Sequence, residues 1–112
     1  MGHTRIIFSD ATTAEAASAL KSCGYLESSQ GGLFTNPNSP IKIYVVWGKS
    51  PYFPELAGGL DFAPRIQIHL KCRDIIPELF EVTLGAVNGL RGNSPGTRSV
   101  VFNADTGEEL PC

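Results

Sequence analysis

The sequence lacks the residue clusters that mark metal-dependent and thiol-based sites. It contains three cysteines and two histidines in 112 residues, and neither a CxxC pair nor another ligand spacing connects them. We therefore expect no metal site and no bound cofactor. An odd number of unpaired cysteines is typical of a reducing compartment, which predicts a cytoplasmic location.

Long hydrophobic runs and an excess of positive charge are also missing. No apolar segment approaches the roughly 20 residues that cross a bilayer, so we expect no membrane partner. Nine Lys and Arg against eleven Asp and Glu give a formal net charge of −2, and the basic residues are scattered along the chain. Nucleic-acid-binding proteins normally concentrate basic residues on one face, and nucleic acid is therefore not an expected partner.

The clearest pattern that is present lies in residues 65–72, where polar and apolar side chains alternate without a break. This period predicts a strand with one buried and one solvent-exposed face, with Gln67 and His69 on the exposed face. The segment 75–88 then repeats apolar residues at helical spacing, which predicts a helix. Because His69 and Cys72 are three positions apart, alternation places them on opposite faces and argues against a thiol–imidazole pair.

An earlier strand-then-helix pattern begins at residues 5–8, a short run of β-branched and aromatic residues. Thr12 and Glu15 have the spacing of a capping box, in which each side chain accepts a hydrogen bond from a free backbone N–H of the first helical turn. Gly24 is the residue expected to end this helix in a left-handed conformation.

The other predicted strands lie between and after these two units. Residues 25–28 and 33–35 flank a Gly-Gly turn and are expected to form a hairpin, whereas 41–47 carries apolar residues on both faces, as a central strand does. A last strand is expected at 98–103. Residues 108–112 are expected either as a frayed tail or, in part, as a short edge strand.

The resulting order is β-α-β-β-β-α-β in a single domain that spans residues 1–112. It predicts an α+β fold in which two helices pack on one face of a mainly antiparallel sheet. In the order of its elements, residues 4–103 resemble the ferredoxin-like split βαβ family with an added hairpin. The resemblance implies a fold only, because the same architecture hosts many functions.

The candidate functional segment is the proline- and glycine-rich stretch 48–64, which is longer than most connections. Aromatic side chains on a proline-stiffened loop are typical of binding hot spots. An alternative is that Phe53, Leu56 and Phe62 fold back over the sheet as a lid on the core. The residues proposed for partner binding are Trp47, Tyr52, Phe53, Glu55, Asp61, Phe62, Gln67 and His69.

Three functions are compatible with these observations. A small acidic α+β domain without catalytic motifs looks like the bacterial immunity proteins, which implies an inhibitor that covers a partner protein, for example a basic toxin steered by opposite charge. The second is a ligand-sensing or structural homodimer, favoured by the two-sided apolar strand 41–47. The third is a small cofactor-free enzyme that uses His69, Asp61 or Arg65, in which case His69 should have a perturbed pKa and lie in a cleft.

Overall fold

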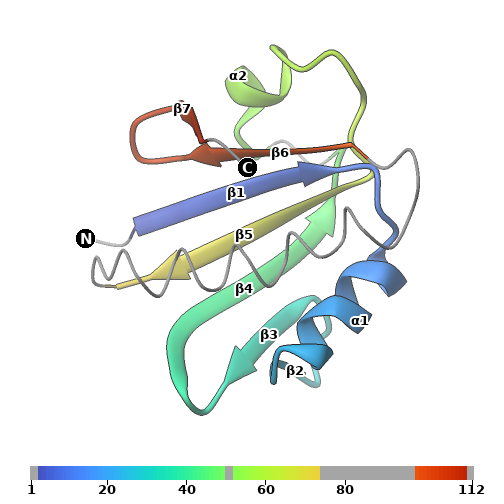
Figure 1. The fold of residues 1–112 in the computed structure, drawn as a ribbon, viewed down its shortest axis with the longest axis vertical. Helices are drawn as coiled ribbons and strands as arrows, with labels where there is room; N and C mark the ends of the chain where they lie inside the picture. Colours follow the sequence, from blue (N-terminus) through green and yellow to red (C-terminus); the bar gives the residue numbers. More distant parts are fainter. Residues whose placement is uncertain (1–2, 50–51, 74–97, 111–112) are drawn as a thin grey trace.

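The computed structural model describes residues 3–49, 52–73 and 98–110 of the chain. In this part of the chain, seven strands form one antiparallel sheet in the order β2-β3-β4-β5-β1-β6-β7 (Figure 1). The predicted α+β class and antiparallel sheet are confirmed. The strands are β1 (His3–Ser9), β2 (Leu26–Glu27), β3 (Leu33–Asn36), β4 (Ser39–Trp47), β5 (Ile66–Cys72), β6 (Ser99–Asn103) and β7 (Glu108–Leu110).

Helix α1 (Thr13–Ser22) begins and ends where the sequence signals predict. The Thr12 hydroxyl accepts from the Glu15 amide at 3.1 Å, and the Glu15 carboxylate accepts from the Thr12 amide at 3.3 Å. At the other end, Gly24 has a φ of +89°, and its amide donates to the Lys21 carbonyl at 3.1 Å. The capping box and the left-handed glycine therefore satisfy backbone groups that the helix itself cannot pair.

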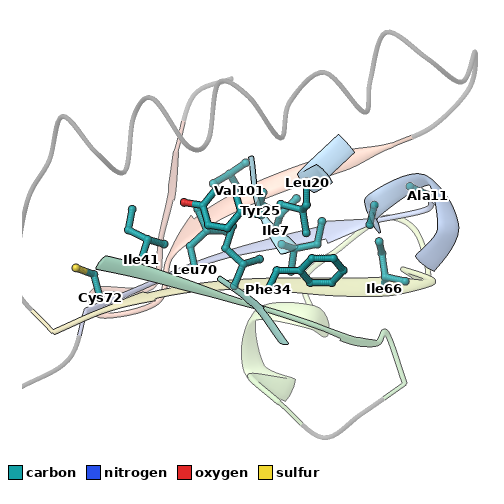
Figure 2. Packing of buried hydrophobic residues seen from close by; sticks show 13 residues of the cluster. Ile7, Ala11, Leu20, Tyr25, Phe34, Ile41, Ile66, Leu70, Cys72 and Val101 are labelled. Carbon is teal, nitrogen blue, oxygen red and sulfur yellow. The ribbon is translucent and has the colours of Figure 1, made fainter. Parts of the chain in front are cut away.

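The hydrophobic core lies between the sheet and α1. Alternate residues of the strands point to this face, so that Ile7 of β1, Ile68 of β5 and Val45 of β4 are neighbours in the register. Leu20 and Ala16 of α1 pack against them and are fully buried. Burial of a Leu or Ile side chain contributes about 1.5–3 kcal/mol, so this layer stabilises the sheet–helix contact. Figure 2 shows the labelled members of this cluster along the sheet: Ile7, Ala11, Leu20, Tyr25, Phe34, Ile41, Ile66, Leu70, Cys72 and Val101.

The opposite face of the sheet is also covered. The segment from Tyr52 onward, which includes the short helix α2 (Pro54–Ala57), lies on the side away from α1 (Figure 2). On this face Gln67 has no exposed surface and His69 is 2% exposed. The prediction that these two residues face solvent is therefore wrong, because it assumed that only one face of the strand was covered.

The remaining predictions have mixed outcomes. The hairpin is confirmed by pairing of β2 with β3, and residues 108–110 form the edge strand β7 rather than part of a frayed tail. The helix predicted over 75–88 lies outside the described residues. Helix α2 was not predicted. No helix in the described ranges is long and apolar enough to cross a membrane.

Candidate functional site

The site is built where β4 leaves the sheet and β5 enters it. Trp47, the last residue of β4, pairs with Ile66, the first residue of β5. The Gly48 amide then donates to the Arg65 carbonyl at 2.8 Å, and a Cβ atom on Gly48 would lie 2.0 Å from the Pro64 carbonyl oxygen. Only glycine allows the end of β4 to approach Pro64 and Arg65 so closely. This contact fixes the backbone positions of Trp47 and Lys49, the residues on either side of Gly48.

Trp47 is the most exposed large hydrophobic residue of this region. Its relative exposure is 72%, although β4 is an interior strand. Beside the indole lies a groove of about 550 Å³, which we call the Trp47 groove. It is lined by Thr12, Thr13, Trp47, Lys49, Ala63, Pro64, Arg65 and Ile66.

Two further hollows adjoin this groove. A wide, shallow one of about 700 Å³ shares Lys49, Ala63 and Pro64 with the groove and includes Asp61 and Phe62 in its lining. A smaller one of about 270 Å³ lies beside Trp47 and is lined in part by residues of α1, β3 and β4. The indole thus stands between depressions, a surface shape into which a partner's side chains can fit.

The aromatic residues at the start of the 52–64 segment cover His69 on the other face of the sheet. The rings of Tyr52 and Phe53 meet the imidazole edge-to-face, with centroid distances of 5.3 and 5.5 Å. Phe53 adopts a left-handed backbone with a φ of +50°, a conformation that costs a non-glycine residue about 1 kcal/mol or more. Phe53 packs over the sheet as the lid alternative expects. Tyr52 also contacts His69 but remains half exposed.

A hydrogen-bonded chain satisfies the polar atoms beneath this cover. The Gln67 amide nitrogen donates to the Gly48 carbonyl at 3.2 Å, so the amide oxygen of Gln67 faces His69. The Nε2 atom of His69 lies 2.9 Å from that oxygen. An oxygen acceptor at this distance assigns the proton to Nε2, which makes His69 the donor of this bond.

Burial holds His69 in its neutral form. Desolvation, together with a smaller effect from the charge of Lys71 on the same strand, lowers the pKa of His69 from 6.5 to about 4. The ammonium group of Lys71 lies 5.3 Å from the centre of the Tyr44 ring. The pKa is perturbed as an enzyme would require, but His69 lines none of the three depressions around Trp47.

The structure divides the eight predicted partner-binding residues into three groups. Trp47, Asp61 and Phe62 line adjoining depressions at the β4–β5 junction. Tyr52, Phe53 and Glu55 belong to the segment on the opposite face, where Glu55 is exposed in the first turn of α2. Gln67 and His69 are buried and present almost no surface that a partner protein could contact.

The sequence did not single out Lys49 or the threonines of the groove as site residues, and Arg65 was named only in the enzyme alternative. The signal lay in strand pairing. When two consecutive strands pair antiparallel, the residues just after the first strand and those just before the second lie next to each other, at the same end of the strand pair. Applied to predicted strands 41–47 and 65–72, this rule would have brought Lys49 and Arg65 together.

Comparison with known proteins adds no assignment to this geometry. No protein-family model, curated protein or solved structure matches the chain. Within residues 3–49, 52–73 and 98–110, no group of three or more His, Cys, Asp or Glu side chains is placed to hold a metal ion. The surface around Trp47 is therefore the feature of the described residues that bears most directly on function.

Proposed function

We propose that this chain is a protein-binding module that inhibits a partner protein by covering part of its surface. The observation that carries the proposal is the 72% exposure of the Trp47 indole beside the Trp47 groove. Burial of a rigid aromatic side chain contributes much contact area for little lost conformational entropy, and for this reason tryptophan and tyrosine dominate interface hot spots.

Tyr52 supplies a second anchor. It is 50% exposed, and its contact with the buried His69 restrains the ring before any partner binds. A restrained side chain loses less entropy on binding than a free one. Tyr52 therefore has the preorganisation that a tight inhibitor needs.

The charges near these anchors define what the partner must offer. Glu55 and Asp61 are exposed on the 52–64 segment, whereas Lys49 and Arg65 are exposed around the Trp47 groove. A basic toxin, as an immunity-type inhibitor would require, suits the acidic side of this surface. The groove side calls for an apolar or acidic group of the partner, and so the proposed partner presents both signs of charge.

The ferredoxin-like architecture also remains a proposal. It is supported by the order β4-β5-β1-β6 of four neighbouring strands. It is also supported by the connection from β1 to β4, which contains α1 and the β2–β3 hairpin and passes over β5, the strand between them. Because β1 and β4 are both antiparallel to β5, they are parallel to each other, as in a split βαβ unit. The segment that would provide the second crossover, 74–97, lies outside the described residues.

The homodimer and enzyme alternatives gain less support. The apolar character of both faces of β4, which favoured a dimer, has another explanation in its interior position between β3 and β5. For the enzyme, His69 has the perturbed pKa but lies beneath two aromatic rings instead of in a cleft. A cytoplasmic location stays part of the proposal, with Cys23 and Cys72 present as free thiols.

Capture of partners on immobilised protein tests this function. We expect wild-type protein to retain a stoichiometric partner from the source lysate and the Trp47→Ala/Tyr52→Ala variant to lose it. Leu26→Ala is the matched control, because Leu26 is a large hydrophobic residue that is 65% exposed on the edge strand β2. Equal capture by all three proteins, or loss with the control alone, would show that this surface is not the binding site.

A further inference from the structure

The Trp47 groove has an apolar body with basic residues at its margin. The hydrophobic residues along it are Trp47, Ala63, Pro64 and the buried Ile66, and Lys49 and Arg65 are the charged ones. Both are exposed. In the described part of the chain, neither side chain forms a hydrogen bond or an ion pair. Two unpaired cations at the edge of an apolar depression are complementary to an apolar anion.

Among the described residues, no carboxylate forms an ion pair with either cation. The Glu15 carboxylate accepts hydrogen bonds from the amide and hydroxyl of Thr12, at 3.3 and 3.1 Å, within the capping box. Asp61 contributes to the neighbouring shallow hollow and not to the groove. Within the described ranges, Lys49 and Arg65 are therefore exposed cations of the groove lining without a paired carboxylate.

The size of the groove indicates a small molecule. Its volume of about 550 Å³ lies within the roughly 300–1,000 Å³ typical of small-ligand sites. We propose that the groove binds a small monocarboxylic acid with an aromatic or aliphatic body. The body packs against Trp47, Ala63 and Pro64, and the carboxylate lies between Lys49 and Arg65. This inference goes beyond the proposed inhibitor function and does not depend on it.

Trp47 is the single tryptophan of the chain, so its fluorescence reports occupancy of the groove. We would titrate purified protein with two acids, 4-phenylbutyrate and octanoate. The matched probes are 4-phenylbutanamide, which is neutral, and 4-phenylbutylamine, which is cationic. Saturable changes are expected for the acids with a Kd of about 1 mM or below. The amide should bind several-fold more weakly, and the amine should bind least.

Charge variants then locate the carboxylate. Lys49→Gln/Arg65→Gln should weaken binding of 4-phenylbutyrate by about fivefold, as expected for exposed charge pairs, and leave the amide unchanged. Lys42→Gln is the control, because Lys42 is exposed near the other end of β4. Higher salt should weaken acid binding only in proteins that retain both cations.

Three results would overturn the proposal. They are the absence of a saturable signal with either acid, equal affinity for acid and amide, or an unchanged acid affinity in the double variant with a native unfolding transition. The assay uses the purified chain alone. Its failure would therefore leave the partner-capture result standing, and the reverse also holds.

Discussion

At the scale of single residues, Gln67 and His69 show where the sequence misleads. Polar residues at every second position of a strand normally indicate a solvated face. Here the two side chains satisfy each other and the Gly48 carbonyl through hydrogen bonds of 2.9 and 3.2 Å. Such a pair tolerates burial at little cost, and periodicity alone does not distinguish it from a solvated pair.

The buried neutral state of His69 predicts a pH dependence of stability. Its pKa is about 4 in the folded protein and 6.5 ordinarily, so between these values the unfolded chain binds a proton that the folded chain excludes. The stabilising contribution is complete above pH 6.5 and is lost as the pH falls toward 4. Between pH 7 and about pH 4.5 the free energy of unfolding should fall by about 2–3 kcal/mol from this residue.

Urea unfolding at the two pH values measures this effect. Carboxylates also titrate in this range, and therefore the same measurement on His69→Gln provides the reference. The wild type should lose more stability than this variant on acidification. An equal loss in both proteins would contradict the burial of a neutral His69.

Gly48 is the described glycine at which an added side chain would clash most severely. A Cβ atom there would lie 2.0 Å from the carbonyl oxygen and 2.6 Å from the carbonyl carbon of Pro64, both rigid backbone atoms. Gly48→Ala should therefore lower the free energy of unfolding by about 3 kcal/mol. Gly59→Ala is the matched control, since its nearest atom would be the Leu56 carbonyl oxygen at 3.8 Å, and it should change stability by less than about 0.5 kcal/mol. Similar urea midpoints for the two variants would refute the close approach.

At the scale of elements, sequence patterns predicted the helix and the strands whose positions depend on interactions between residues close in the chain. The capping box and Gly24 located α1 because hydrogen bonds within a few residues fix its ends. Alternation located β5, β-branched and aromatic residues located β1, and apolar residues on both faces located β4. The 52–64 segment has neither signal. Its contacts with His69 are tertiary, and its place on the second face could not be predicted from residues 52–64 alone.

The capping box makes a prediction for α1. Thr12→Ala removes the hydroxyl that accepts a hydrogen bond from the Glu15 amide. The change should lower the free energy of unfolding by about 1 kcal/mol. Thr13→Ala, at the exposed first helical position, should alter stability by less than about 0.5 kcal/mol. Denaturant unfolding of both variants tests this. If Thr13→Ala proved the more damaging change, the assignment of the cap would be incorrect.

At the scale of the whole molecule, one sheet with two covered faces explains where the exposed aromatic residues lie. The core occupies the α1 side, and Tyr52 and Phe53 cover His69 on the other side. Trp47 stands at the β4–β5 junction with 72% of its surface exposed. A side chain this exposed contributes little to the core, and the proposed function assigns it to binding.

Hydroxyl-radical footprinting of the captured complex tests that assignment most directly, because it compares the exposed side chains within one experiment. In the free chain, Trp47, Tyr52 and Leu26 should all be oxidised, as their exposures of 72%, 50% and 65% require. With partner bound, we predict that oxidation of Trp47 and Tyr52 falls several-fold while that of Leu26 is unchanged. Protection of Leu26 with undiminished oxidation of Trp47 would contradict the account.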